Sequence, residues 1–351
     1  MALWLDKYKP KTLDQLTYHK GLTSQLKGLA ASDNVPHVLF YGPPGAGKKT
    51  RIASLLREMF GPGAEKLKVE QRPFVTTSNR KLIFNVFSSN YHLELNPSDL
   101  GIYDRVIVQD VLKEIAESPQ IDTHAKHRFK VVLINQADEL TREAQAALRR
   151  TMEKYTANIR LILCCDNLSK VIDPVRSRCL LVRVARPSVD EVTDVLHSVA
   201  VKQNLSLSSI LTKNIAEQSK CNVREALLML ESTAVQHPDL KNVQRPEKTD
   251  WQILISRIAK KMMDEPTLAS LAWIRTNLYD LFVHGIPSSL VIKTLAFELF
   301  HSTTDSELRK TIMDKASYNE YRLTIGTKDI FHLEAFAVSL MDEFSRHGKN
   351  F

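Results

Sequence analysis

A glycine-rich turn constrains the fold of this chain more than any other feature of its sequence. The turn follows the apolar run 38–41 and reads, in order, Gly42, Pro43, Pro44, Gly45, Ala46, Gly47 and Lys48. This spacing, between a strand and a helix, lets backbone N–H groups surround a phosphate while the lysine reaches the outer phosphates. The turn therefore predicts a nucleotide-phosphate site, and a glycine turn without a ligand is the weaker alternative.

The pattern around this turn predicts the fold class. Through the first half of the chain, apolar runs expected to be strands alternate with amphipathic stretches expected to be helices. The expected strands are 38–41, 85–95, 131–134 and 160–165, and the expected helices are 48–59, 104–117 and 142–155. Alternation of this kind predicts an α/β fold in which a parallel sheet carries helices on both faces.

The pattern becomes purely helical after Pro187. Ser188 and Glu191 have the spacing of a capping box, which predicts the start of a helix. The polar stretch 237–249 is expected to be a linker, and apolar residues recur at helical spacing beyond it. The chain is therefore expected to have three domains, at 1–184, 185–240 and 250–351.

Composition narrows the classes of function. Lys and Arg number 48 against 40 Asp and Glu, a net charge of +8, which is compatible with a nucleic-acid neighbour. No apolar run approaches the ~20 residues of a membrane span, and the opening residues lack a signal-peptide stretch, so neither a membrane segment nor secretion is expected. The four cysteines lack metal-site spacing and are expected to be reduced, buried thiols: Cys164, Cys165, Cys179 and Cys221.

Two places depart from the pattern of a nucleotide hydrolase. The residue after Lys48 should be Ser or Thr, whose hydroxyl ligates Mg²⁺, but it is Lys49, and Thr50 is rotated about 100° around the helix. The later apolar strand should lead into an acidic pair that supports the metal and polarises water, but Asn135 and Gln136 follow it. These amides keep the shape of the acids without their charge. Nucleotide binding without Mg²⁺ and without hydrolysis is therefore expected, with Lys49 supplying part of the metal's charge.

Three motifs carry a resemblance to a known family. The chain opens with WLDKYKPKTL at 4–13 and later carries AQAALRRTME at 144–153 and SRC at 177–179. With these motifs it resembles, over essentially its whole length, the small subunits of replication factor C, the eukaryotic AAA+ clamp loader. Its loop is most similar to that of the small subunit with a degenerate Lys-Lys P-loop. The resemblance implies a P-loop AAA+ domain at 1–184, a helical lid at 185–240 and an all-α collar that builds the oligomer at 250–351.

The resemblance also implies nucleotide contacts. Leu5 and Thr17 match positions that flank the adenine, and Arg224 matches the sensor 2 arginine, although by itself it reads as a solvated helix arginine. Asp166 stands at the sensor 1 position, where asparagine is usual, and an acid beside phosphates is unfavourable unless it is paired. We therefore expect Asp166 to pair with Lys49.

The SRC motif implies a role in a neighbouring subunit. Its Arg178 matches the family's arginine finger, which projects into the nucleotide site of the next subunit. A guanidinium there stabilises charge on the γ-phosphate in the transition state. A structural salt bridge near a strand end is the alternative interpretation. The chain carries the arginine that would act on a neighbour's nucleotide but lacks the metal ligand and the acidic pair needed at its own site. This difference favours the role of Arg178 in trans.

Further contacts follow from the resemblance. The region 104–117 is expected to dock on the sliding clamp, although packing on the chain's own sheet explains its apolar stripe equally well: Val108, Leu112 and Ile115. Candidates for contact with DNA phosphates or with a neighbouring subunit are Arg80, Lys81, Arg149, Arg150 and Glu153.

The function that follows is a non-catalytic or very weakly catalytic subunit of the nuclear replication factor C pentamer. The pentamer loads the PCNA clamp onto primer–template DNA in replication and repair, and this subunit is expected to hold ADP or ATP without needing Mg²⁺. Two alternatives stay open. One is a working ATPase that recruits Thr50 or Asp138 to the metal, and the other is a DNA-binding scaffold with an empty nucleotide pocket.

Overall fold

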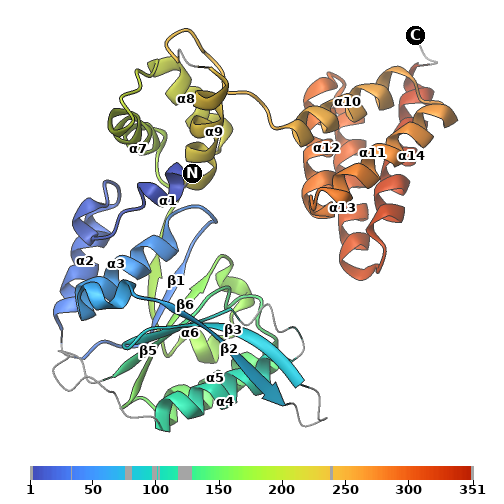
Figure 1. Ribbon diagram of the computed structural model, residues 1–351. Coiled ribbons are helices and arrows are strands. Elements are labelled where there is room, and N and C mark those ends of the chain that lie inside the picture. Colours follow the sequence, from blue (N-terminus) through green and yellow to red (C-terminus); the bar gives the residue numbers. More distant parts are fainter. Residues whose placement is uncertain are drawn as a thin grey trace. The chain divides into compact units, whose positions relative to one another are not determined.

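The protein is described by a computed structural model that covers residues 3–32, 34–75, 81–96, 101, 103–117, 129–237 and 240–348 (Figure 1). It consists of two compact units, Met1–Pro246 and Glu247–Phe351. The first unit contains the glycine-rich turn together with the predicted α/β and helical segments up to the linker. The second contains only helices among its described residues.

A seven-stranded sheet forms the base of the first unit, in the order β2-β3-β4-β5-β6-β1-β7. Neighbouring strands from β4 to β7 pair in parallel, whereas β2 pairs with β3, and β3 with β4, in antiparallel register. The strand bounds are Val38–Tyr41 for β1, Lys68–Val75 for β2, Lys81–Ser88 for β3, His92–Leu95 for β4, Lys130–Ile134 for β5, Ile159–Cys165 for β6 and Leu180–Arg183 for β7.

The predicted parallel sheet is confirmed from β4 to β7 and is extended by an antiparallel edge, whereas the prediction of one extended segment at 85–95 is wrong. That segment is divided by a tight turn between β3 and β4. The Ser89 hydroxyl accepts hydrogen bonds from the N–H groups of Tyr91 and His92, and the Ser89 N–H donates to the His92 carbonyl at 2.8 Å. A serine that bonds its own backbone in this way favours a turn over a continuous strand.

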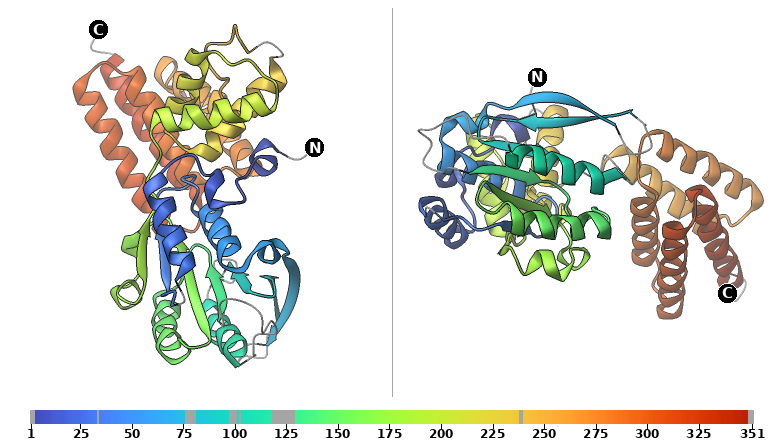
Figure 2. Two further views of the ribbon diagram at one scale, coloured as in Figure 1. Left: turned by 90° about the vertical axis from the view of Figure 1, so that its left-hand side faces the viewer. Right: turned by 90° about the horizontal axis from the view of Figure 1, so that it is seen from below.

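Helices cover both faces of the sheet, as predicted (Figures 1 and 2). Successive residues of β1 alternate between the two cores: Val38 and Phe40 pack with α2 and α3, whereas Leu39 packs with α4 and α5. The helix bounds are Trp4–Lys7 for α1, Lys20–Ala31 for α2, Lys48–Phe60 for α3, Asp104–Glu117 for α4, Arg142–Lys154 for α5 and Asp173–Arg176 for α6.

The apolar stripe of α4 belongs to one of these cores. Val108, Leu112 and Ile115 are buried against the sheet and α5, with no more than 7% of any of them exposed. The assignment of these three side chains to clamp contact is therefore wrong, because an amphipathic helix on a sheet directs its apolar stripe inward. Exposed positions of the same helix remain available to a partner.

Three further helices of the first unit have a core of their own, and they are α7, Val189–Lys202, α8, Ser209–Gln218, and α9, Val223–Gln236. The predicted capping box is confirmed: the Ser188 hydroxyl accepts from the Glu191 N–H, and the Glu191 carboxylate accepts from the Ser188 N–H. The N-terminal residues Trp4, Leu5 and Tyr8 pack against this core, so the beginning of the chain is attached to helices almost 200 residues away.

The second unit is an all-α domain with one apolar core. The predicted helical stripe at Val291, Leu295 and Leu299 is buried in it. No helix in the described part of the chain has the length and apolar character needed to cross a membrane. The helices are α10, Asp250–Asp264, α11, Leu268–Val283, α12, Ser288–Ser302, α13, Ser306–Ile325, and α14, Asp329–Gly348.

Cys164 and Cys165 are buried and Cys179 and Cys221 are half-buried, and the environment of the first three predicts inert thiols. Burial raises the pKa of the Cys164 thiol to about 11 and of the Cys165 and Cys179 thiols to about 12. Since only the thiolate reacts, a rise of two pKa units reduces the reactive fraction about a hundredfold. Iodoacetamide at pH 8, followed by peptide mass spectrometry, is expected to label these cysteines far more slowly than in the urea-unfolded chain. Equal rates in the two states would contradict the burial.

Candidate nucleotide-binding site

The glycine-rich loop connects the end of β1 to the start of α3, as predicted, and its backbone lies unusually close to other segments. Gly45 has φ +74°, and a Cβ added there would lie 1.6 Å from Oδ1 of Asn222, the N-cap of α9. Gly47 has φ +88°, and its added Cβ would lie 2.3 Å from the Tyr18 hydroxyl. Both glycines are therefore required by backbone conformation and by space. They place the loop between the N-terminal segment and the 185–240 helices.

Lys48 begins α3 and is buried beneath the loop. Its ammonium donates to the carbonyls of Gly42 at 2.6 Å and Pro43 at 2.9 Å. Its third contact is an ion pair at 2.6 Å with Asp166, which follows β6. The predicted pairing of Asp166 with Lys49 is therefore wrong: Lys49 is exposed, because the next helix position is rotated about 100° from Lys48. Asp166 lies beside the phosphate-binding lysine itself.

The end of β5 carries Asn135, which is fully buried. Its Nδ2 donates to Asn96 Oδ1 at 2.8 Å and to Glu94 Oε1, and its own Oδ1 has no partner in the described structure. Gln136 is exposed, with φ +50°. The two amides thus occupy the end of a central parallel strand, where an acidic pair would be needed to hold a metal and activate water.

Glu94 and Asn96 were missed from the sequence. They stand at the end of β4, which pairs in parallel with β5 and so brings their side chains beside Asn135. If 85–95 is taken as a single strand, its pairing with β5 cannot be deduced from the sequence. The polar residues Glu94 and Asn96 could have been recognised as site candidates, because polar residues at the end of a strand in an α/β sheet lie at the edge where ligands bind.

The carboxylate of Asp138 is engaged by backbone. It accepts hydrogen bonds from the N–H groups of Asp166, at 3.3 Å, and Asn167, at 3.0 Å. Asp138 therefore holds the turn that presents Asp166 to Lys48. The ATPase alternative requires this carboxylate or Thr50 to be a metal ligand. In the structure, the Asp138 carboxylate instead accepts hydrogen bonds that hold the turn after β6.

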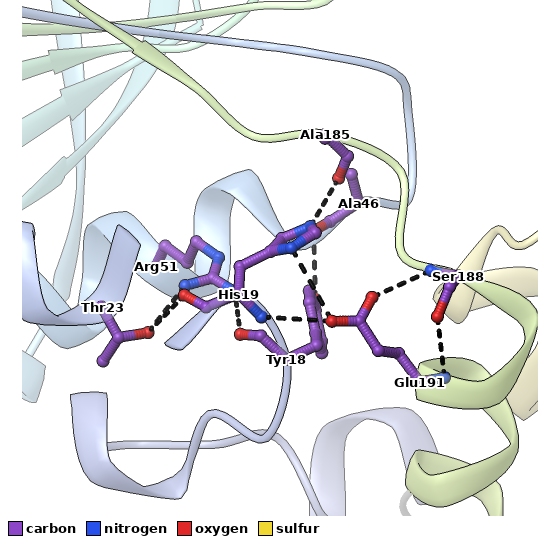
Figure 3. A network of polar contacts seen from close by, with 8 residues as sticks. All are labelled: Tyr18, His19, Thr23, Ala46, Arg51, Ala185, Ser188 and Glu191. Carbon is purple, nitrogen blue, oxygen red and sulfur yellow. Dashed lines mark hydrogen bonds and ion pairs between the residues drawn. The ribbon is translucent and has the colours of Figure 1, made fainter. Parts of the chain in front are cut away.

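The N-terminal segment supplies contacts that sequence reasoning also missed (Figure 3). The Tyr18 hydroxyl donates to the Ala46 carbonyl at 3.0 Å. Arg51, fully buried in α3, donates to the Tyr18 carbonyl at 2.8 Å and to the Thr23 hydroxyl at 3.2 Å, and its guanidinium lies 4.9 Å from the centre of the Tyr18 ring. Burial raises the pKa of Tyr18 and lowers that of Arg51. No sequence rule places an arginine inside a core, since the residue is ordinarily exposed.

His19 joins the same segment to the first helix of the 185–240 region (Figure 3). One Glu191 oxygen accepts from the His19 N–H at 3.5 Å, and the His19 Nε2 lies 3.1 Å from the Ala185 carbonyl. Burial raises the pKa of the Glu191 carboxyl, but hydrogen bonds from the N–H groups of Ser188 and His19 outweigh it and leave the pKa below its ordinary value. Glu191 is therefore an ionised bridge between α7 and the segment beside the loop.

The remaining residues predicted to contact the nucleotide lie on the segments around the glycine-rich loop. Thr17 is exposed and immediately precedes Tyr18, and Thr50 is half-buried in the first turn of α3. Arg224 is exposed in the first turn of α9, two residues after the Asn222 that touches the loop. Leu5 lies against the core of α7, α8 and α9. The structure thus brings the loop, Thr17 and the start of α9 together.

The predicted trans arginine has partners within its own chain. Arg178 donates through Nε to Glu153 at 2.9 Å and through Nη1 to the Pro174 carbonyl at 2.8 Å. The hydrogen bond from Arg178 is the main reason that the pKa of Glu153 lies below its ordinary value. Arg149 approaches the same carboxylate at 3.7 Å, and both it and Arg150 are exposed. Of the DNA candidates, Arg80 lies outside the described residues, and for Lys81 only the backbone in β3 is described.

Gly45→Ala is expected to destabilise the first unit by roughly 1–3 kcal/mol, because it imposes a strained backbone and a clash with Asn222. Gly28→Ala is the matched control: it lies inside α2 with no neighbour within 4 Å and should stabilise by about 0.5–1 kcal/mol. Urea unfolding measures both changes. Adding Asn222→Ala to Gly45→Ala should recover part of the lost stability. If Gly45→Ala and Gly28→Ala were equally stable, the close packing of Gly45 against Asn222 would be contradicted.

Comparison with protein families matches three parts of the chain. Residues 18–188 match the model of the DNA polymerase III delta subunit, residues 194–235 the RCF1/5-like AAA+ ATPase lid domain, and residues 251–347 the C-terminal domain of replication factor C subunit 3. Among solved structures, a RuvB mutant of Thermotoga maritima matches with a TM-score of 0.50 and 15% identity over 78% of this chain and 85% of that one. That likeness concerns the fold alone.

Whole-chain relatives give the decisive similarity. Replication factor C subunit 5 of Neurospora crassa is 50% identical over 347 residues, which cover 99% of this chain and 98% of that protein. Replication factor C subunit 3 of Mus musculus is 46% identical over 97% of this chain and 96% of its own length. With AAA+ base, lid and helical C-terminal domain all matched, the chain belongs to the replication factor C small-subunit family, in the group whose members are named subunit 3 or subunit 5.

Proposed function

We propose that this chain is a clamp-loader subunit of DNA replication that binds ADP or ATP without hydrolysing it. One observation carries the proposal: the loop is built to hold phosphate, while the strand end beside it carries two amides where a hydrolase carries an acidic pair. The Lys48 ammonium is held under the loop by two backbone carbonyls and one carboxylate. The adjoining strand end carries the neutral Asn135 in a buried position.

The electrostatics of the site support binding without a metal. Lys48 and Lys49 both stand in the first turn of α3, whose N-terminus carries partial positive charge. Hydrolysis would need a metal ligand and a general base, and neither Asn135 nor Gln136 provides an ionised oxygen. Asp166 partly neutralises Lys48 and is itself nearly half exposed, with 47% of its side chain accessible. Nucleotide phosphates would therefore displace a carboxylate that can turn to water.

The second part of the proposal gives Arg178 a role in a neighbouring subunit. Its side chain is 30% exposed, and its carboxylate partner Glu153 is 52% exposed, so the pair is accessible from the surface. An exposed ion pair of this kind contributes little to stability and can be exchanged for another anion. In an assembly of replication factor C subunits, the γ-phosphate held by the next subunit would be that anion, and Glu153 would hold the guanidinium ready beforehand.

The assembly that this role requires is the nuclear heteropentamer that loads PCNA onto primer–template DNA in replication and repair. We assign the exposed Arg149 and Arg150 of α5 to contact with DNA phosphates or with a neighbouring subunit. Backbone-directed DNA contact needs donors and positive charge without base reading. The whole-chain relatives, named as subunits of replication factor C, support membership of such an assembly.

Binding of nucleotide is expected to survive removal of Mg²⁺. Titration of the chain with a fluorescent ADP analogue should give dissociation constants that differ by less than about threefold between excess Mg²⁺ and EDTA, because protein cations and helix N–H groups supply the charge. Lys48→Ala should weaken binding at least about tenfold. An affinity that collapses in EDTA would contradict the proposed metal-free site.

Arg178→Ala is expected to impair ATP hydrolysis in the assembled complex while leaving nucleotide binding to this chain unchanged. Loss of an arginine finger lowers hydrolysis at the affected site by about 10³-fold or more. Arg176→Ala is the matched control, because Arg176 is 32% exposed and also pairs with a carboxylate, that of Asp173, but has no proposed role. DNA-dependent ATP turnover of the reconstituted complex is the measurement. If Arg178→Ala and the control turn over ATP at the same rate, Arg178 is not an arginine finger and only forms the salt bridge with Glu153.

A further inference from the structure

Arg51 is buried in a way that calls for explanation. None of its side chain is exposed, its Nε has no hydrogen-bond partner, and it forms no ion pair with a carboxylate in the part of the chain that the structure describes. Burial lowers the pKa of Arg51, and the nearby charge of Glu191 opposes that effect only in part. Burying a cation without a directly paired carboxylate is costly, and a leucine or methionine would fill the same space without that cost. A residue kept under these conditions is expected to do something that an apolar residue cannot.

The contacts of Arg51 converge on Tyr18. Its Nη2 donates to the Tyr18 carbonyl at 2.8 Å, and the guanidinium lies 4.9 Å from the centre of the Tyr18 ring. The same side chain therefore restrains both the backbone and the ring of Tyr18. The Nη1 of Arg51 also donates to the Thr23 hydroxyl at 3.2 Å, which attaches the guanidinium to α2.

Tyr18 in turn restrains the phosphate loop (Figure 3). Its hydroxyl donates to the Ala46 carbonyl at 3.0 Å, and it occupies the space that a Cβ on Gly47 would need, at 2.3 Å. Ala46 and Gly47 are the last residues of the loop before Lys48, and the N–H groups of this stretch are those that a bound phosphate accepts from. A displacement of Tyr18 therefore displaces phosphate donors.

We propose that Arg51 is a positioning residue for the nucleotide, which acts through Tyr18 to hold the Ala46–Gly47 backbone in its phosphate-binding conformation. The inference rests on the proposed function, because it needs nucleotide to bind at the loop. Arg51 also lies one helical turn after Lys48, so it fixes the loop to the same helix that carries the phosphate-binding lysine. Loop, Tyr18 and α3 thereby form one rigid frame.

The variants that test this differ in which contact they remove. Tyr18→Phe keeps the ring over Arg51 and removes only the hydroxyl that bonds Ala46. Arg51→Met removes the guanidinium at nearly constant length, and Arg51→Lys keeps the charge and one donor. Thr23→Val is the control, because it removes the hydrogen bonds of the Thr23 hydroxyl with Arg51 and with the His19 carbonyl. It leaves in place the bond from Arg51 to the Tyr18 carbonyl and the bond from the Tyr18 hydroxyl to Ala46.

The measurement is the dissociation constant for ADP, with circular dichroism confirming the fold of each variant. Tyr18→Phe should weaken ADP binding about threefold to tenfold, as expected for one hydrogen bond. Arg51→Met should weaken it at least as much, Arg51→Lys less, and Thr23→Val by less than about twofold. Because Arg51 acts through Tyr18, the Tyr18→Phe/Arg51→Met double variant should bind no more weakly than Arg51→Met.

Other results would overturn the proposal. If the wild-type chain binds ADP and Tyr18→Phe binds it equally well, Arg51 and Tyr18 serve the core alone. If the losses in the two single variants multiply in the double variant, the residues act independently. Should Arg51→Met fail to fold, the comparison of Tyr18→Phe with Thr23→Val still decides, because equal affinities would contradict the route through Tyr18. A wild-type chain that binds no ADP would defeat the proposed function first, and this inference with it.

Discussion

The close approach of distant segments to one loop backbone is the constraint on which the rest of the first unit depends. Gly45 meets the N-cap of α9, Gly47 meets the Tyr18 hydroxyl, and an added Cβ at either position would fall within 2.3 Å of those atoms. A loop held in this way is already ordered by the protein around it, so a ligand need not supply the energy to order it. The same contacts connect the base of the first unit to the helices that follow it.

The charge around the loop fits the proposed role of holding an anion. Lys48 is buried and contacts two backbone carbonyls and one carboxylate, whereas Lys49 beside it is exposed. Arg51 is buried one helical turn later in α3. On the opposing strand end, the acidic pair of a hydrolase is replaced by Asn135 and Gln136. In the proposed function, the chain would contribute architecture to an assembly whose other subunits carry out the chemistry.

Much of this could be predicted from the sequence, for physical reasons that differ between elements. The loop, the helix that follows it and the capping box at Ser188 are set by local chemistry over a few residues, and the structure confirms them. The buried stripe of α4 was also readable as a pattern, but a pattern does not say whether an apolar face meets the chain's own sheet or a partner. Burial of Val108, Leu112 and Ile115 decides that question in favour of the sheet.

What the sequence could not provide is long-range geometry. Glu94 and Asn96 reach Asn135 only because β4 and β5 are paired, and Asp166 meets Lys48 and not Lys49 because of the direction in which α3 leaves the loop. From the sequence, Arg51 would be expected on the surface, because arginine is usually exposed. It is buried because it contacts Tyr18 and Thr23, which precede it by 33 and 28 residues.

A single-turnover measurement shows whether the chain retains ATP without cleaving it. The chain alone, at a concentration above that of ATP labelled on its γ-phosphate, is held with Mg²⁺ and quenched at intervals over hours. We expect the ATP to remain bound and intact, with phosphate release no faster than that of Lys48→Ala. Stoichiometric phosphate release that depends on Mg²⁺ and disappears in Lys48→Ala would contradict it and establish the chain as a working ATPase.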